Sequence, residues 1–119
     1  MGSSLSTPKN DPQVEAHIQR LVAENPVIAF TKVTCPYCAS TKLILKQKRV
    51  QHVCIDVDIT SGGSALHHTL KQMTGQRTVP CIFINGQRIG GNSELRALKK
   101  SGELDKMLES VPRTADHVG

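Results

Sequence analysis

Two cysteines three positions apart carry the clearest chemistry in this 119-residue chain, in the run Cys35-Pro36-Tyr37-Cys38. Two thiols at this spacing can close into a disulfide and open again, and the thiolate form of either can attack a disulfide in another molecule. The pair therefore predicts thiol–disulfide exchange.

Other uses of a close cysteine pair fit the sequence less well. A zinc site needs four ligands, but Cys54 and Cys81 are isolated and no second Cys-x-x-Cys completes a set, so no bound metal is expected. A structural disulfide between residues three apart would constrain little of the unfolded chain, because the entropic gain grows with loop length. None of the five histidines has a local signature of a cysteine protease, and His67 and His68 are expected on an exposed helix face.

The segments on either side of the first cysteine predict how it is positioned. The apolar run 27–30 follows a proline and predicts a strand, whereas the spacing of apolar residues over 39–45 predicts a helix. Cys35 then falls at the N-cap of that helix, with Pro36 at the first helical position, where a missing N–H is harmless. Unpaired backbone N–H groups and the helix dipole stabilise a thiolate at an N-cap. We therefore expect Cys35 to be the nucleophile and Cys38, one turn later, to be the resolving thiol.

The rest of the chain alternates between helical and strand patterns, which predicts an α/β fold. The expected elements are a helix starting at Asp11-Pro12, a second strand over 50–59, a helix over 65–73, a hairpin of 82–84 and 87–89 around Asn85-Gly86, and a helix capped by Asn92 or Ser93 whose apolar stripe continues to Val111. A right-handed strand–helix–strand crossover makes the first two strands parallel.

Length and composition predict one small domain over residues 11–112, between a flexible segment 1–10 and a flexible tail 113–119. The chain has no apolar stretch of the roughly 18 residues that span a membrane, and its start has no apolar core of a secretory signal. Four cysteines with one close pair favour a reducing compartment, and we expect the cytoplasm. The net charge of +5 does not predict nucleic-acid binding, because aromatic residues are only 3% and the basic residues are scattered.

Three motifs, taken together and in this order, resemble a dithiol glutaredoxin. They are Lys32 to Cys38, then Gln76-Arg77-Thr78-Val79-Pro80, and then Gly90-Gly91 with Ser93. The resemblance covers roughly residues 12 to 111. It implies a thioredoxin-like fold, with a four-stranded mixed sheet flanked by about five helices, and glutathione-dependent thiol–disulfide exchange.

The resemblance also implies a glutathione site. Its expected members are Lys32, Tyr37, Gln72, Arg77, Thr78, Val79, Pro80, Gly91, Asn92, Ser93 and Glu94. A cis Val79-Pro80 bond would present the main chain of Val79 to the cysteinyl backbone of glutathione like an added strand.

The two ends of glutathione are expected to meet different parts of this set. Lys32, Gln72 and Arg77 match positions that hold the glycine carboxylate, whereas backbone N–H groups near Gly91 and the side chain of Ser93 match the γ-glutamyl end. Glu94 stands where the family usually has Asp, so ligand contact and helix capping are both open for it. Tyr37 can pack either beside the tripeptide or against the protein.

The resemblance implies glutathione as reductant and co-substrate, and glutathionylated or disulfide-containing proteins as substrates. Because no nucleotide-binding glycine motif is present, NADPH would enter through a separate glutathione reductase. A monomer is expected. Two other functions remain open: a glutathione-ligated iron–sulfur cluster carrier, against which Pro36 argues, and a non-catalytic redox adaptor. Cys54 and Cys81 are expected to be small buried hydrophobes in strands, and Cys81 can also serve as a regulatory thiol beside Pro80.

The first six residues, Met1 to Ser6, match the pattern for N-myristoylation at Gly2. A cloning remnant can produce the same residues, so both origins are open. Membrane contact is expected only if Gly2 carries the acyl chain, and one chain alone gives marginal binding.

Overall fold

A four-stranded sheet forms the centre of the molecule. The computed structural model describes residues 11–114. The strands are β1 Val27–Thr31, β2 Val53–Asp56, β3 Cys81–Ile84 and β4 Gln87–Gly90, arranged in the order β2-β1-β3-β4. β1 runs parallel to β2 and antiparallel to β3, and β3 runs antiparallel to β4. The predicted mixed sheet with parallel first and second strands is confirmed.

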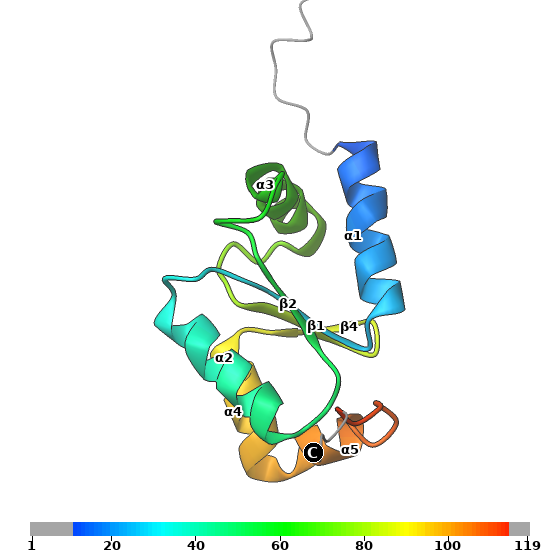
Figure 1. Cartoon of the computed structure of the whole chain (residues 1–119), viewed down its shortest axis with the longest axis vertical. Helices are drawn as coiled ribbons and strands as arrows, with labels where there is room; N and C mark the ends of the chain where they lie inside the picture. Colours follow the sequence, from blue (N-terminus) through cyan, green and yellow to red (C-terminus); the bar gives the residue numbers. More distant parts are fainter. Residues whose placement is uncertain (1–10, 115–119) are drawn as a thin grey trace, which may run out of the picture.

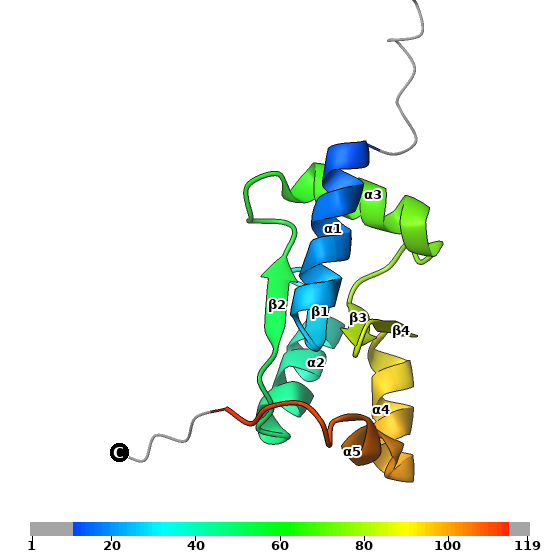
Figure 2. The same cartoon turned by 90° about the vertical axis from the view of Figure 1, so that its right-hand side faces the viewer.

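Five helices cover the two faces of this sheet. They are α1 Pro12–Glu24, α2 Pro36–Gln47, α3 Gly63–Thr74, α4 Asn92–Ser101 and α5 Glu103–Met107. α1 and α3 lie on one face, while α2, α4 and α5 lie on the other (Figures 1 and 2). The arrangement is the thioredoxin-like fold predicted from the sequence. Among residues 11–114, no helix combines the length and the apolar character that a membrane crossing requires.

β1 is the strand on which both layers depend. All five of its residues are buried, and it is paired on both edges. An unbroken apolar run is typical of a strand covered on both faces, because alternate side chains enter different cores. Val27 and Ala29 point into the layer of α2, α4 and α5, whereas Ile28 and Phe30 point toward α1 and α3.

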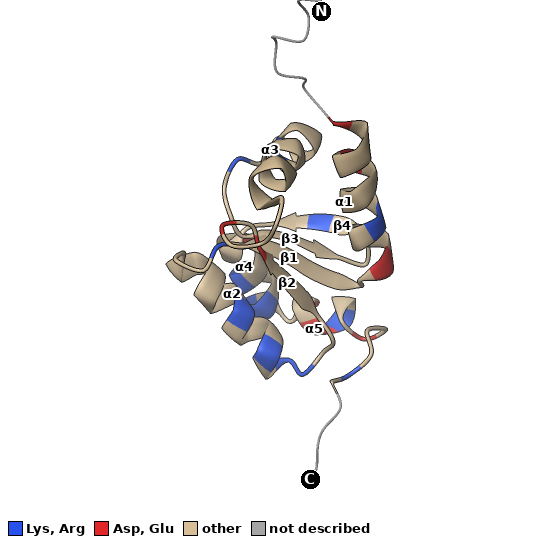
Figure 3. Ribbon diagram, turned by 45° about the horizontal axis from the view of Figure 1, so that its top comes forward, with Lys and Arg blue, Asp and Glu red and all other residues tan. Residues whose placement is uncertain are grey.

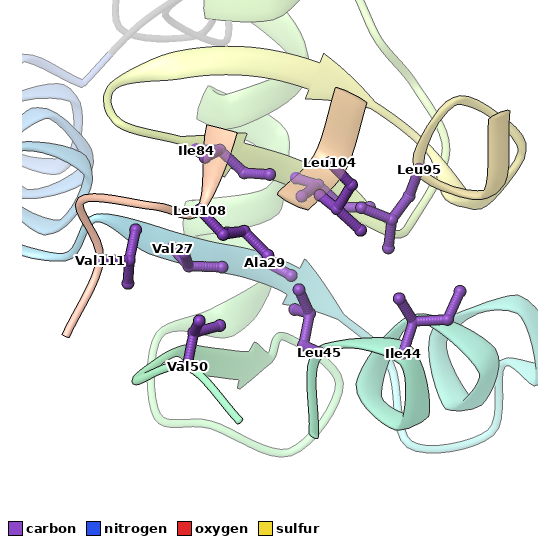
Figure 4. Packing of buried hydrophobic residues seen from close by; sticks show 11 residues of the cluster. Val27, Ala29, Ile44, Leu45, Val50, Ile84, Leu95, Leu104, Leu108 and Val111 are labelled. Carbon is purple, nitrogen blue, oxygen red and sulfur yellow. The ribbon is translucent and has the colours of Figure 1, made fainter. Parts of the chain in front are cut away.

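The two resulting cores have different compositions. Aliphatic side chains fill the core beneath α2, α4 and α5, where Leu45, Leu95 and Leu104 meet the sheet (Figure 4). The opposite core contains the two phenylalanines, Phe30 and Phe83, packed edge to face with ring centroids 6.1 Å apart. Such a pair contributes about 0.5–1.5 kcal/mol beyond the area it buries.

Two local predictions are confirmed at turns and caps. The Asp11 carboxylate accepts hydrogen bonds from the N–H groups of Gln13 (2.9 Å) and Val14 (3.5 Å), so it caps α1 as expected. Asn85 and Gly86 both have positive φ, 51° and 82°, which is the geometry of a type I′ turn between β3 and β4.

Several element boundaries differ from the predicted ones. The second strand spans Val53–Asp56 rather than 50–59, because Ile59 N–H and Thr60 N–H turn back to the carbonyl of Asp56. The third helix extends over Gly63–Thr74 rather than 65–73. The last apolar stripe is divided between α4 and α5 by Gly102, whose φ of 86° ends the first helix.

The C-terminal boundary and one histidine also differ from expectation. Arg113, predicted to open the flexible tail, pairs with Val50 in an isolated bridge, and Thr114 N–H donates to the Arg49 carbonyl at 3.0 Å. Residues 1–10 and 115–119, including the predicted myristoylation site, lie outside the described residues. His68 is exposed as expected, but His67 is half-buried, and burial lowers its pKa.

Core burial on the α4 side predicts a clear difference between two leucines. Leu95→Ala should lower the free energy of unfolding by about 2–5 kcal/mol, because Leu95 is fully buried and the substitution leaves a cavity. Leu43→Ala on α2 is the matched control, since Leu43 is 55% exposed and its loss should change stability by less than about 0.5 kcal/mol. Urea unfolding followed by circular dichroism measures both, and equal losses would contradict this packing.

Candidate active site

Cys35 lies at the N-cap of α2, as predicted. Its backbone is extended (φ −98°, ψ 116°), and Pro36 follows at the first helical position. The Cys35 sulfur accepts a hydrogen bond from the N–H of Cys38 at 3.3 Å, so it takes the place that an oxygen occupies at an ordinary N-cap. The residue is only half-buried. The sulfur of Cys35 is therefore in contact with the first turn of α2 and remains accessible to a second molecule.

Cys38 has a very different environment, although it lies only one turn away. It is fully buried, and its sulfur accepts a hydrogen bond from the N–H of Lys32 at 3.4 Å. Burial raises the pKa of Cys38 to about 12, and its hydrogen bond with Cys35 acts in the same direction. Cys38 is therefore a neutral thiol at physiological pH, and the two free cysteines are unequal.

The loop before β3 faces the first cysteine. Val79-Pro80 is a cis peptide bond, as the family resemblance implied. The thiol of Cys35 lies 3.8 Å from the carbonyl oxygen of Val79, close enough for a weak hydrogen bond from sulfur. The main chain of Val79 thus lies directly beside the reactive sulfur.

A surface hollow extends along this loop and the start of α4. Eight of the predicted glutathione-binding residues line it: Tyr37, Thr78, Val79, Pro80, Gly91, Asn92, Ser93 and Glu94. Tyr37 forms part of its wall with 67% of its surface exposed, which places the ring beside the hollow rather than in the core.

Three predicted residues do not line this hollow. Lys32 lines a neighbouring one, together with Asp58, His67 and Lys71. Gln72 and Arg77 are exposed and lie outside the lining of both. The structure brings together the residues predicted for the cysteinyl and γ-glutamyl parts of glutathione, but not those predicted for the glycine carboxylate.

The comparisons with known proteins agree with this geometry. The glutaredoxin family model matches residues 27–89, which is more than half of the chain. The chain belongs to the glutaredoxin family. It is 40% identical over 99 residues to glutaredoxin-1 of Rhizophagus irregularis, covering 83% of this chain and 98% of that protein. It is 36% identical over 99 residues to glutaredoxin-1 of Saccharomyces cerevisiae, covering 80% and 90%.

Solved glutaredoxin structures share the fold. A complex of buckwheat glutaredoxin with glutathione superimposes with a TM-score of 0.78 at 37% identity, covering 82% of this chain and 88% of that one. Wheat glutaredoxin gives 0.78 at 39% identity, covering 82% and 90%.

In this glutaredoxin, Glu94 acts as a helix cap. Its Oε1 accepts hydrogen bonds from the N–H of Gly91 at 2.8 Å and from the hydroxyl of Ser93 at 3.2 Å. The bond from Gly91 lowers the pKa of Glu94, so the carboxylate is ionised at neutral pH. The helix begins at Asn92, which makes Gly91 the N-cap rather than the predicted Asn92 or Ser93.

The Asn92 side chain joins two helices and is not free to meet a ligand. It is buried, and its Nδ2 donates to the hydroxyls of Ser40 at 3.1 Å and Thr41 at 3.0 Å on α2. The bonds fix the start of α4 relative to the cysteine helix. Asn92 thus joins the start of α4 to α2 through its side chain and also belongs to the lining of the hollow.

Sequence reasoning missed two further contributors to the hollow. Arg88 Nη1 donates to Gln76 Oε1 at 2.8 Å, and Gln76 Nε2 donates to the carbonyls of Pro80 at 2.9 Å and Thr78 at 3.1 Å. Gln76 is part of the second motif, but the sequence predicted no contact for it. Arg88 has the pattern of an ordinary polar residue on an edge strand. Only the tertiary structure shows that the loop before β3 brings Gln76 to Arg88 on β4.

A third missed residue holds the loop before Cys35. Both carboxylate oxygens of Asp58 accept from the N–H of Val33, at 3.1 and 3.0 Å. These bonds tie the loop that follows β1 to the turn that follows β2. No spacing in the sequence relates residues 25 positions apart.

The other two cysteines do not reach the site as nucleophiles. Cys81 is buried, as expected, and burial raises its pKa to about 11. Cys54 is half-buried at the edge of the aliphatic core, and burial likewise raises its pKa. Among residues 11–114, no three or more His, Cys, Asp or Glu side chains gather in a way that could hold a metal ion.

The cysteine environments predict selective alkylation. With limiting iodoacetamide at pH 7, the reduced protein should be labelled first at Cys35, because Cys38 and Cys81 are buried neutral thiols. Peptide mass spectrometry identifies the labelled cysteine, and the same experiment in denaturant should label all four. Labelling of Cys38 as fast as Cys35 in the folded protein would contradict this environment.

Proposed function

We propose that the chain reduces protein–glutathione mixed disulfides, and protein or small-molecule disulfides, with Cys35 as nucleophile and Cys38 as resolving thiol. Its family membership supports a glutathione-dependent thiol–disulfide oxidoreductase. The assignment of roles rests on the contrast between two sulfurs that lie one helical turn apart. The sulfur of Cys35 is accessible and caps the helix, whereas the sulfur of Cys38 is buried and neutral.

The monothiol reaction needs Cys35 alone. Its thiolate attacks the glutathione sulfur of a mixed disulfide, forming the Cys35–glutathione bond and releasing the substrate cysteine as a thiolate, which takes a proton from water. A second glutathione, as thiolate, then attacks the glutathione sulfur bound to Cys35. Oxidised glutathione leaves and the Cys35 thiolate is regenerated.

The dithiol reaction also uses Cys38. The Cys35 thiolate attacks a substrate disulfide, which forms a Cys35–substrate mixed disulfide and releases the first substrate sulfur as a thiolate. Cys38 then attacks the Cys35 sulfur: the internal Cys35–Cys38 bond forms, the second substrate sulfur leaves as a thiolate, and the proton of Cys38 passes to water or to that thiolate. The high pKa of Cys38 makes it a poor thiolate until the mixed disulfide forms, so the attack follows the first step. Two glutathiones then reduce the internal disulfide.

The binding assignments extend this proposal. The main chain of Val79 would pair with the cysteinyl part of glutathione, as its position 3.8 Å from the Cys35 sulfur supports. Lys32 and Arg77 would approach the glycine carboxylate from outside the hollow, and Gln72 would need to turn toward it. Basic side chains are numerous on α2 and α4 (Figure 3), and a positive surface favours an anionic co-substrate.

The cellular setting is also a proposal. We infer a reducing compartment, the cytoplasm, and a monomer that depends on a separate NADPH-dependent glutathione reductase. Related glutaredoxins carry chloroplastic and mitochondrial names as well. No observation on the described residues favours the iron–sulfur carrier or the redox adaptor.

Kinetics of single-cysteine variants test the two roles. Cys35→Ser should abolish reduction of a glutathionylated peptide, because no other described cysteine is both accessible and N-capping. Cys38→Ser should retain that reaction but lose most reduction of a protein disulfide, which requires the resolving thiol. The measurement couples oxidised glutathione formation to NADPH oxidation by added glutathione reductase.

Cys54→Ser is the matched control, since Cys54 lies on β2 and outside the hollow. It should leave both reactions unchanged. Loss of every glutathione-dependent reaction in Cys38→Ser would refute the monothiol step.

A further inference from the structure

Lys42 lies one helical turn beyond Cys38 on α2, so the two side chains share a face of the helix. Residues at this spacing have their Cβ atoms about 5–6 Å apart. The Cys38 side chain is fully buried, whereas the Lys42 side chain keeps 36% of its surface exposed. Lys42 therefore brings a positive charge to the side of α2 that carries the resolving thiol.

Asp56, the last residue of β2, holds this ammonium in place. Lys42 Nζ donates to Asp56 Oδ1 at 2.9 Å and to Oδ2 at 3.2 Å. The same Oδ1 accepts from the hydroxyl of Thr31 at 2.7 Å, and Thr31 is fully buried. The carboxylate is thus fixed from α2 and from the end of β1, and it fixes the charged end of Lys42 in turn.

The end of β1 also connects this ion pair to the sulfur of Cys38. Thr31 pairs with Asp56 in the register of β1 and β2. The next residue, Lys32, donates its N–H to the Cys38 sulfur at 3.4 Å. The resolving thiol and the ion pair are therefore held by two consecutive residues of the same strand end.

Burial and three neighbours set the acidity of Cys38. Burial raises the pKa of this thiol most strongly, and its hydrogen bond with Cys35 and the charge of Cys35 act in the same direction. The backbone N–H of Lys32 and the ammonium of Lys42 lower the pKa. Among these neighbours, Lys42 is the one whose side-chain charge favours the thiolate.

Lys42 can act on Cys38 only through its charge. The hydrogen bond to Asp56 raises the pKa of Lys42, so the amine is protonated at neutral pH and has no lone pair to accept a proton. Against the effect of burial, the hydrogen bonds from Lys42 and Thr31 lower the pKa of Asp56, which is therefore ionised. Cys54 also faces Lys42 from β2, but burial raises its pKa and it stays neutral.

We propose that Lys42, fixed by Asp56, assists the resolving step of the dithiol reaction by stabilising the negative charge that Cys38 acquires as it attacks the Cys35 sulfur. The internal disulfide forms, the substrate sulfur leaves as a thiolate, and the proton of Cys38 passes to water or to that thiolate. Lys42 acts through Cys38 and touches no substrate, so it is a positioning residue. The inference rests on the proposed dithiol reaction.

An uncharged disulfide reagent separates the two steps. Reduced protein in excess over 4,4′-dithiodipyridine releases one 4-thiopyridone when Cys35 attacks the reagent, at a rate proportional to protein concentration. Attack of Cys38 on the resulting mixed disulfide releases the second 4-thiopyridone, at a rate independent of protein concentration. Stopped-flow absorbance follows both phases between about pH 6 and pH 9. All proteins carry Cys54→Ser, which removes the other half-buried thiol.

Lys42→Gln should slow the second phase about threefold or more and leave the loss confined to that phase. Without the ammonium the pKa of Cys38 rises, and with a Brønsted coefficient of about 0.5 each unit slows the attack about threefold. The second phase should accelerate with rising pH in both proteins, because Cys38 is a neutral thiol throughout this range, and the two curves should run parallel.

Three further variants separate charge from structure. Lys42→Arg should keep the second phase, because it keeps the charge. Asp56→Asn should not slow it, because the ammonium remains and the amide oxygen can still accept its hydrogen bond. Lys46→Gln is the matched control, an exposed lysine one turn further along α2, and should change neither phase. Thermal unfolding shows whether each variant folds like the wild type, and Lys42→Met replaces Lys42→Gln if the latter does not.

The proposal is overturned if removal of the Lys42 charge leaves the second phase unchanged or slows both phases equally. It is also overturned if Asp56→Asn slows the second phase as much, since the ion pair would then be only a structural link between α2 and β2. Failure of the proposed dithiol reaction looks different: the folded protein with Lys42 intact would release one 4-thiopyridone and show no second phase.

Discussion

The pairing of β1 with its two neighbours is the constraint on which the site depends. Phe30, near the carboxyl end of β1, is paired with Cys81, the first residue of β3, because the two strands are antiparallel. The loop that leaves β1 toward Cys35 and the loop that enters β3 through Pro80 must therefore lie side by side. The contact between the Cys35 sulfur and the Val79 carbonyl follows from this register and not from any nearness in sequence.

The unequal chemistry of the two cysteines arises one level lower, in α2 itself. The N-cap position exposes the sulfur of Cys35 to an N–H of the first turn, whereas the next turn carries Cys38 to the side of the helix that faces the core. Helical geometry alone gives the two sulfurs different environments, one accessible and one buried. Burial raises the pKa of Cys38 and keeps its thiol protonated at neutral pH.

At the start of α4, the same residues line the hollow and make packing contacts within the protein. Asn92 anchors this helix to α2 through Thr41, so the wall of the hollow is fixed relative to the nucleophile. Glu94 caps the helix that it begins, which satisfies a backbone donor and also places a permanent negative charge at the hollow. The longer side chain of Glu94, at the position where the family usually has Asp, forms its hydrogen bond within the protein.

Much of the fold could be predicted because its local patterns agree with its tertiary structure. The buried run of β1, the N-cap at Cys35 and the Asn85-Gly86 turn each have a local physical cause, and all three were found from sequence. Strand and helix ends were less accurate, since the end of β2 depends on a turn back to Asp56. The residues that were expected to bind the glycine carboxylate of glutathione do not line the hollow. Exposed side chains such as that of Gln72 have no local pattern that sets their direction.

The sequence by itself determined the reactive pair, the order of the elements and the family, because these depend on residue types at short spacings. Only the tertiary structure decided which side chains meet across the hollow: Arg88 with Gln76, Glu94 with Gly91, and Asp58 with Val33. Glu94 and Gly91 lie close in sequence, but both ligand contact and helix capping were possible for Glu94 until the first residue of the helix was known. The other contacts join separate elements, whose register is set by the burial of whole strands and helices and not by the residues that finally touch.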